Sequence, residues 1–256
     1  NPHLTYCTNI HAGETWGDIE TVLAHALPRV KAGISPDRAM GVGLRLSARA
    51  AEELSAPALR ERFKRFLGEH DLYVFTVNAF PYGSFHGERV KERVYEPDWR
   101  TPQRLGFTCR VADLLADLAP DGLDASISTV PGGFRANIAT ATGVARVAEG
   151  FARAAAHLDG IRRRSGRTIT LAIEPEPACF LETTDEAVRF LEEHLFRGPA
   201  AELFAALAGI PAREAERRLR RHVGLCFDVC HSAVAFEETI PMLDAVHGAG
   251  IAVAKL

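Results

Sequence analysis

The stretch GLCFDVCHSAVAF, residues 224–236, decides the predicted fold of the chain. A short run of strand-like sequence leads directly into Asp228, and His231 follows three positions later. A carboxylate at the end of a buried strand is costly unless it is hydrogen-bonded, paired or bound to a cation. The stretch therefore predicts that a buried strand delivers Asp228 and His231 to one polar site.

The same kind of unit recurs along the chain: a short β-rich apolar run, a turn, and a long segment with helical spacing. The predicted strands are residues 4–11, 39–47, 72–80, 124–130, 168–176, 223–228 and 250–256. Thr15, Ser47 and Thr183 stand at predicted helix starts, where their side chains can accept from unpaired backbone N–H groups. Strict alternation of strands and helices predicts right-handed crossovers and a parallel sheet, and hence an α/β fold.

Two architectures fit this alternation, an open doubly wound sheet and a closed (β/α)8 TIM barrel. No Gly-x-Gly-x-x-Gly phosphate motif follows the first predicted strand. Nearly every predicted strand instead ends in a polar side chain: His11, Arg45, Asn78, Ser128 with Thr129, Glu174, Asp228 and Lys255. Because the carboxyl ends of barrel strands converge on one mouth, this pattern favours the barrel.

The predicted barrel forms a single domain over residues 1–256, with a helical insertion near residues 197–222. The last predicted strand, residues 250–256, is the seventh, and the chain stops inside its apolar run. We therefore expect the eighth strand of the barrel to be missing from this chain.

The amino-acid composition limits which binding partners and which cellular compartment are expected. The 256 residues are 47% hydrophobic and 25% charged, and the net charge of -3 gives no support to a nucleic-acid partner. Five scattered cysteines predict reduced thiols rather than a disulfide framework. No apolar run reaches the roughly 20 residues that span a bilayer. These features predict a cytoplasmic protein without membrane insertion, and they imply no oligomeric state.

Glu174, in the sequence AIEPEP, presents the same problem as Asp228 because it ends the preceding predicted strand. Two carboxylates on adjacent strands repel each other unless a positive charge lies between them. A divalent metal supplies that charge, and His231 adds an imidazole ligand. The set suits Mn, Mg, Zn or Co without choosing among them.

Two of these motifs carry a resemblance to a known superfamily. FDVCH resembles the Asp-x-x-His signature on the sixth strand of xylose isomerase-like TIM barrels, and AIEPEP is similar to their metal-binding glutamate motif on strand five. That superfamily contains sugar isomerases, ketose 3-epimerases and DNA repair enzymes of the endonuclease IV type. Longer stretches, among them LTYCTNIHAGETW, GVGLRLSARAAEEL, VNAFPYGSFHGERVKERVYEPDWR, STVPGGF and LAIEPEPACFLETT, resemble EboE-type metabolite traffic proteins. This resemblance implies a role in handling a small metabolite.

The superfamily resemblance implies roles for individual residues. Glu174 would be a metal ligand and an acid/base, Asp228 a metal ligand, and His231 a contact to the metal or to a substrate oxygen. Lys255 stands where metal-binding members often have a histidine, and an ammonium cannot be a ligand. Lys255 is therefore a catalytic candidate, or its ammonium replaces the metal by pairing with Glu174 and Asp228. The usual fourth ligand, a glutamate on strand eight, would lie beyond Leu256.

The segment at residues 78–100 is long and aromatic, which is typical of a functional loop rather than a simple connector. Its aromatic side chains could form an apolar wall over the barrel mouth, or a hydrophobic cluster that only pins the loop. Arg45 could bind a substrate anion or pair with Glu14. The candidate substrate-binding residues are His11, Arg45, Asn78, Tyr82, His86, Trp99 and Glu176.

Three functions follow as hypotheses. The first is a metal-dependent sugar or small-polyol isomerase or epimerase that acts in metabolite processing or traffic. The second is a non-catalytic barrel that binds a metabolite, with Lys255 marking a lost metal position. The third, an endonuclease IV-like phosphoesterase, needs three metals and a histidine-rich cluster, for which the predicted strand ends offer too few histidines.

Overall fold

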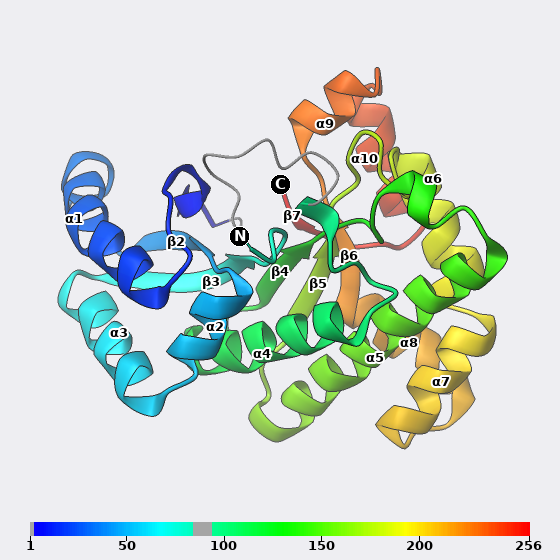
Figure 1. Cartoon of the computed structure of the whole chain (residues 1–256), viewed down its shortest axis with the longest axis horizontal. Helices are drawn as coiled ribbons and strands as arrows, with labels where there is room; N and C mark the ends of the chain where they lie inside the picture. The colour runs from blue at the N-terminus through cyan, green and yellow to red at the C-terminus, as the bar shows by residue number, and fades with distance from the viewer. Residues whose placement is uncertain (1–2, 84–93) are drawn as a thin grey trace.

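A parallel sheet forms the centre of the computed structural model, which describes residues 3–83 and 94–256 (Figure 1). The strands lie in the sheet in chain order, and every neighbouring pair is parallel. They are β1 (Thr5–Cys7), β2 (Met40–Arg45), β3 (Leu72–Asn78), β4 (Ala125–Thr129), β5 (Ile169–Ile173), β6 (Val223–Cys226) and β7 (Val253–Lys255). This arrangement confirms the predicted α/β fold.

The sheet curls toward a barrel, with β1 and β7 at its two edges. Strand β7 pairs with β6 and also contacts β5 and β4. The Lys255 Nζ atom of β7 donates a hydrogen bond of 3.1 Å to Ser128 Oγ on β4, so this side chain crosses the concave side of the sheet. The curl brings the carboxyl ends of separate strands toward one another, as a barrel-like arrangement requires.

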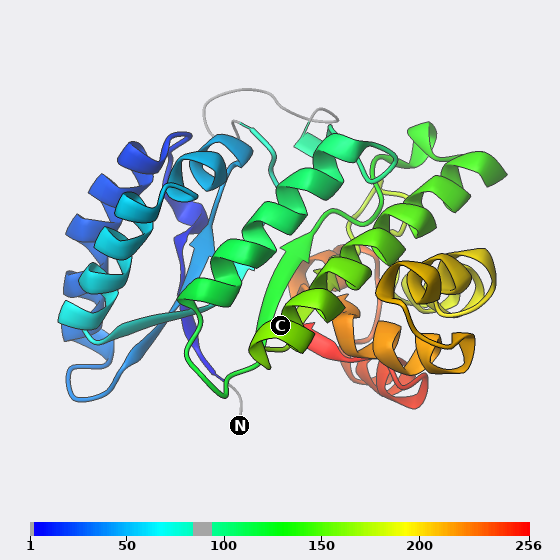
Figure 2. The same cartoon turned by 90° about the horizontal axis from the view of Figure 1, so that it is seen from below.

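Helices cover the outer face of the sheet (Figure 2). The helices of the described residues are α1 (Trp16–Ile34), α2 (Ala48–Leu54), α3 (Pro57–Glu69), α4 (Pro102–Leu118), α5 (Ala141–Ser165), α6 (Thr184–Phe190), α7 (Gly198–Ala208), α8 (Ala215–His222), α9 (Val229–Val234) and α10 (Thr239–Gly248). Helix α9 lies beyond the carboxyl end of β6 rather than on the outer face (Figure 1). Shorter helical turns are η1 (Thr8–Ile10), η3 (Arg135–Asn137), η4 (Leu191–Leu195) and η5 (Ala212–Glu214). Helices α7 and α8 account for most of residues 197–222, where the sequence predicts an insertion.

The predicted helix caps are confirmed. Thr15 accepts from the backbone of Asp18 and Thr183 from that of Glu186, and each pair forms a complete capping box. Ser47 accepts from Ala50 N at the start of α2. Each cap satisfies a donor that the first helical turn leaves unpaired, typically stabilising the helix by about 1 kcal/mol.

Several strands are shorter than predicted, and this places polar residues just beyond them. Strand β1 ends at Cys7 because Thr8 leaves the regular ladder: its hydroxyl donates to Gly43 O and accepts from Arg45 N. Strand β5 ends at Ile173, before the run Glu174-Pro175-Glu176-Pro177, whose prolines have no N–H for a strand ladder. The carboxylate that follows β5 is therefore on a connecting segment rather than in the sheet.

Gly224 permits the close approach of β6 to β7. A Cβ atom at this position would lie 2.4 Å from the backbone oxygen of Ala252. Leu225 N donates to the same oxygen at 2.8 Å, so the two chain segments are held together next to the missing side chain. The glycine at the start of the decisive stretch thus lets β6 pack where it can deliver Asp228.

His222, at the end of α8, predicts a pH dependence of stability. Its ring is fully buried, Nδ1 lies 2.9 Å from Ile169 O, and burial lowers the pKa of His222. The unfolded chain takes up a proton at this histidine below about pH 6.5, where the folded protein resists it. The free energy of unfolding should therefore fall as the pH drops through 6.5 toward the lower folded pKa, and less so in His222→Gln.

Denaturant unfolding of both proteins between pH 5 and 8 measures this difference. His247→Gln, at an exposed position of α10, is the matched control. Parallel pH profiles for the wild type and His222→Gln would contradict the prediction.

Candidate functional site

Glu174 and Asp228 are positioned by backbone hydrogen bonds at the carboxyl ends of β5 and β6. Glu174 N donates to Thr129 O at 3.1 Å, and the Glu174 side chain is only 13% exposed. Asp228 is the N-cap of α9, where its Oδ1 accepts from Cys230 N at 2.7 Å and from His231 N at 3.2 Å. The cap occupies one carboxylate oxygen of Asp228 and leaves Oδ2 available to another partner.

His231 lies in the first turn of α9, directed toward both carboxylates. Its Nδ1 is 3.2 Å from Pro175 O. A carbonyl oxygen only accepts, so Nδ1 carries the hydrogen of this bond, and Nε2 of the neutral ring keeps its lone pair. Nε2 is 3.8 Å from Asp228 Oδ2, and Nδ1 is 4.0 Å from Glu174 Oε1. A carbonyl behind the ring is the usual way in which proteins orient a metal-ligating histidine.

The three side chains form a donor set suited to a divalent cation. One potential ligand atom from each of Glu174, Asp228 and His231 lies within 4.8 Å of the other two. Two carboxylate oxygens and an imidazole nitrogen fit the ligand preferences of Zn, Mn or Co. The donor chemistry of the residues present therefore fits a metal, and its identity is not set by this donor set.

Burial and mutual repulsion shape the titration of the two glutamates. Burial raises the pKa of Glu174, and Asp228 adds to the rise, while Lys255 and His231 oppose it. Burial likewise raises the pKa of Glu176 to about 7, with His231 and Tyr95 opposing the rise. Carboxyls held in this way are stabilised in their charged form by any cation that enters the site.

A cavity of about 210 Å³ opens above these side chains. It is lined by Asn9, Arg45, Asn78, Phe80, Pro81, Glu174, Glu176, Asp228 and His231. Six of these are candidate site residues from the sequence: Arg45, Asn78, Glu174, Glu176, Asp228 and His231. The curl of the sheet thus brings together side chains from segments far apart in the sequence.

Asn9 is a cavity residue that the sequence analysis missed. It lies in η1, inside the segment predicted as the first strand, and its Oδ1 is buried without a hydrogen-bond partner among the described residues. The sequence could have indicated Asn9, because it lies only two residues before His11, the predicted end of the first strand. Because β1 ends at Cys7, Asn9 rather than His11 lines the cavity.

Arg45 and Asn78 enter the cavity with part of their hydrogen-bonding capacity already used. Arg45 Nη2 is 2.9 Å from Glu14 Oε1, and Nη1 donates to Gly13 O at 2.8 Å. Asn78 Oδ1 accepts from Phe80 N at 2.9 Å, which engages the acceptor atom of its side-chain amide. Of the two alternatives for Arg45, the pair with Glu14 is formed.

Lys255 does not bridge the two carboxylates. Its Nζ donates to Ser128 Oγ, and within the described part of the chain it makes no ion pair with Glu174 or Asp228 inside 4.0 Å. It is still near enough to lower the pKa of Glu174. The arrangement in which the ammonium replaces a metal by direct pairing is not formed, and a catalytic role for Lys255 stays a prediction.

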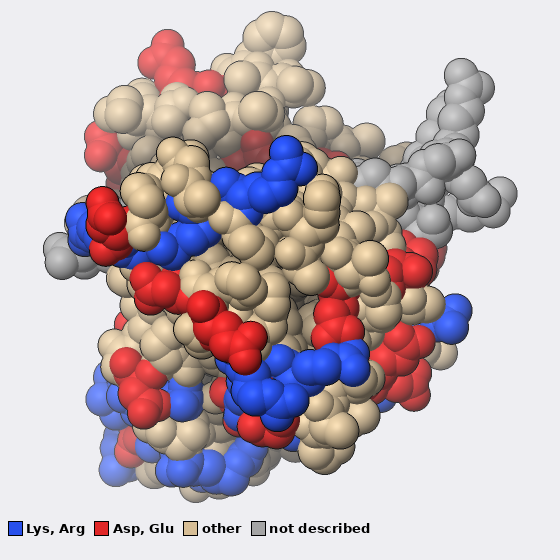
Figure 3. All heavy atoms as spheres, turned by 90° about the vertical axis from the view of Figure 1, so that its left-hand side faces the viewer, with Lys and Arg blue, Asp and Glu red and all other residues tan. Residues whose placement is uncertain are grey.

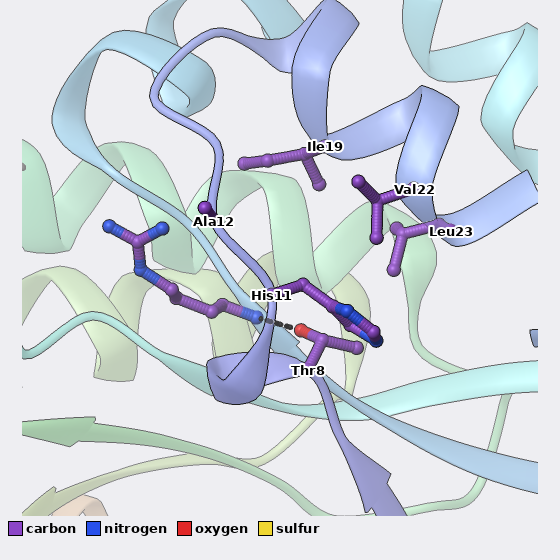
Figure 4. Close-up of a pocket in the computed structure, with 7 residues that line it drawn as sticks. Thr8, His11, Ala12, Ile19, Val22 and Leu23 are labelled. Carbon is purple, nitrogen blue, oxygen red and sulfur yellow. Dashed lines mark hydrogen bonds between the residues drawn. The ribbon is translucent and has the colours of Figure 1, made fainter. Parts of the chain in front are cut away.

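His11, Tyr82 and Trp99 lie away from this cavity. His11 Nε2 is 2.9 Å from Tyr6 OH, and its ring lines a separate pocket of about 10 Å³ beneath α1, with room for little more than a water (Figure 4). Tyr82 packs edge-on against Phe107. Trp99 is 1% exposed, and its Nε1 donates to Thr129 Oγ1.

The remaining candidate, His86, lies outside the described residues. Tyr82 and Trp99 pack against Phe107 and Phe151, respectively, as expected if they belong to a hydrophobic cluster that pins the loop rather than to a wall of the cavity. Buried aromatic side chains with a polar tip usually bury that tip against a partner, as the Trp99 indole does.

The surface and the helices add two observations about partners. On the face of the molecule shown in Figure 3, basic and acidic side chains are interspersed rather than separated. Within the described residues, no helix combines the length and apolar character needed to cross a membrane.

Comparison with known proteins gives limited similarity. No family model matches the chain, and no curated protein matches it. The chain is similar to a solved structure of the IOLI protein with a binding zinc atom, at 15% identity and a TM-score of 0.45, over 82% of this chain and 60% of that one. It is also similar to the structure of SacUVDE, at 14% identity and a TM-score of 0.41, over 96% of this chain and 71% of that one.

This chain therefore spans about 60% of the length of the IOLI structure. Because both TM-scores are below 0.5, the assignment of the fold rests on the strand pairing of this chain.

Proposed function

We propose that the protein is a metal-dependent isomerase or epimerase of the xylose isomerase-like superfamily that acts on a sugar or small polyol. The observation that carries the proposal is the convergence of Glu174, Asp228 and His231 at a cavity of about 210 Å³. The resemblance of FDVCH and AIEPEP to superfamily motifs supports it. We also propose that the protein acts in metabolite processing or traffic, as the resemblance to EboE-type proteins implies.

Glu174, Asp228 and His231 would hold the cation. When bound, a divalent cation polarises a substrate carbonyl and the hydroxyl beside it. The Asp228 cap fixes one ligand, and the Pro175 carbonyl orients the His231 ring so that Nε2 faces Asp228. These contacts hold the donor atoms in place before a cation or a substrate arrives.

In this proposal, Glu174 is the side chain that accepts and returns the substrate proton. Its raised pKa suits a group that takes a proton from one carbon and returns it to a neighbour. Lys255, held by Ser128, places a positive charge near Glu174 and can stabilise its carboxylate. Phe80 and Pro81 supply an apolar wall for the face of a ring or chain.

Metal analysis and isotope exchange test the proposal. We expect purified protein to bind about one equivalent of a divalent metal and to lose thermal stability with chelator, because a ligand of the folded state stabilises it by mass action. Metal-loaded protein incubated with ketoses in deuterated water should place deuterium on carbon. Less than about one-tenth equivalent of metal, with no effect of chelator, would contradict metal dependence.

A non-catalytic metabolite-binding barrel is the second candidate. The observation that favours it is Lys255, a residue that cannot be a ligand at a position where metal-binding members often have one. It is supported if a sugar or polyol binds without any deuterium exchange at carbon. The phosphoesterase hypothesis has less support, because His231 is the single histidine lining the cavity among the described residues.

A further inference from the structure

We propose that Arg162 and Arg221 form a binding site for a phosphate group, at the end of the sheet opposite the cavity. The ligand is a compact anion with close to two negative charges, either inorganic phosphate or the phosphate ester of a small molecule. The two arginines lie at the ends of α5 and α8, which lead into the amino ends of β5 and β6, whereas the cavity lies at the carboxyl ends. The inference therefore stands apart from the proposed function.

Helices α5 and α8 pack against each other and bring the two arginines to one place (Figure 1). Asp159 of α5 is the point of contact: its Oδ2 accepts from Arg218 Nη1 at 3.2 Å. Arg162 follows Asp159 by three residues, and Arg221 follows Arg218 by three residues. Because residues three apart share one side of a helix, Arg162 and Arg221 lie on the sides that meet at Asp159. Thr170, in β5, donates to Arg221 O at 3.1 Å, so the end of α8 also lies beside this strand.

Neither arginine has a counter-charge of its own. Both residues are partly buried, yet among the described residues neither guanidinium forms a hydrogen bond or an ion pair within 4.0 Å. A partly buried cation without a partner costs free energy. Arginine keeps its charge in proteins, so this cost is removed by a bound anion rather than by the loss of a proton.

The titration of neighbouring groups agrees with the proximity of the two guanidinium groups. Burial lowers the pKa of Arg221, and the charges of Arg162 and Arg217 lower it further. Burial is also the main cause of the lowered pKa of His222, and Arg221 and Arg162 add to that effect. Positive charges that disfavour one another in this way favour an anion placed beside them.

The surrounding charges favour a compact anion over a long polyanion. Asp159 lies within 3.2 Å of both Arg163 and Arg218. Glu216 lies 2.8 Å from Arg220, so carboxylates flank the unpaired arginines and would repel a nucleic-acid strand laid across the two helices. A guanidinium presents a rigid fork of N–H donors that matches the oxygens of a phosphate. A phosphate ester carries a charge of about −1.5 to −2 at neutral pH and three acceptor oxygens, so one such group can satisfy both arginines.

Calorimetric titration with inorganic phosphate and with glycerol 3-phosphate tests the site, with potassium chloride at equal ionic strength as the reference. We expect the wild type to bind at least one of the two, and the tighter ligand tells whether the site suits the free ion or an ester. The double variant Arg162→Gln/Arg221→Gln should bind that ligand at least about tenfold more weakly, as the loss of charged hydrogen bonds requires. Each single variant should show part of this loss.

Arg65→Gln makes the same charge change at an exposed position of α3 and should bind as the wild type does. The affinity should also be the same with and without chelator, because the arginines lie away from Glu174, Asp228 and His231. A failure of the metal proposal is therefore seen separately.

Thermal unfolding gives a second measurement. Phosphate stabilises many proteins as an excluded salt, so the informative quantity is the difference between variants. We expect phosphate to raise the melting temperature of the wild type and of Arg65→Gln by more than that of the double variant, whose melting temperature in chloride shows that it is folded. No binding of either ligand, equal affinity in the wild type and the double variant, or an equal loss in Arg65→Gln would each overturn the inference. Arg162 and Arg221 would then be only cations that stabilise the ends of their helices.

Discussion

Asp228→Asn is expected to lower the affinity for a divalent cation by at least about a hundredfold while leaving the fold almost as stable as the wild type. Loss of a direct ligand should cost more than the roughly 10–100-fold that loss of an outer partner costs. Asparagine caps helices as well as aspartate does, so the hydrogen bonds to Cys230 N and His231 N can persist. The substitution therefore separates the charge of Asp228 from its role at the start of α9.

Calorimetric titration with Zn²⁺ or Mn²⁺, together with thermal unfolding in chelator, measures the two effects of this change. Asp228→Ala should lose the metal and also about 1 kcal/mol of stability, because it removes the cap as well. Asp244→Asn, on the exposed side of α10, is the matched control. Wild-type metal affinity in Asp228→Asn would show that the carboxylate serves only as a helix cap.

The second large effect is expected at Trp99. Trp99→Ala should lower the free energy of unfolding by about 3–5 kcal/mol, the usual cost of removing a large buried aromatic side chain. The ring packs on Phe151 at 4.5 Å between centroids, and its Nε1 donates to Thr129 Oγ1 at 3.1 Å. The absence of a side chain at Gly150 makes room for the Trp99 backbone, since a Cβ atom at residue 150 would lie 2.6 Å from Trp99 O.

Urea unfolding of Trp99→Ala and Trp99→Phe would measure this contribution. The phenylalanine variant keeps most of the packing and loses the hydrogen bond, so its loss should be clearly smaller than that of alanine. A near-native stability of Trp99→Ala, combined with weaker sorbitol binding, would instead support the substrate contact that the sequence analysis predicts for Trp99.

Local chemistry allowed much of the fold to be predicted from the sequence. Alternating apolar runs and helical segments predicted a parallel α/β sheet, because each pattern depends on residues close together in the chain. The caps at Thr15, Ser47 and Thr183 were predictable for the same reason. The proximity of Glu174, Asp228 and His231 also followed from the sequence, because the carboxyl ends of neighbouring parallel strands lie at one edge.

Side-chain partners from distant segments were decided only by the tertiary structure. The sequence left open whether Arg45 would pair with Glu14 or bind a ligand, and whether Lys255 would be catalytic or pair with the two carboxylates. The structure pairs Arg45 with Glu14 and directs Lys255 to Ser128. Asn9 rather than His11 lines the cavity, since β1 ends at Cys7 and Thr8, the next residue, bonds through its hydroxyl to the β2 backbone. Such contacts depend on where several segments pack at once, and no short-range pattern along the chain carries that information.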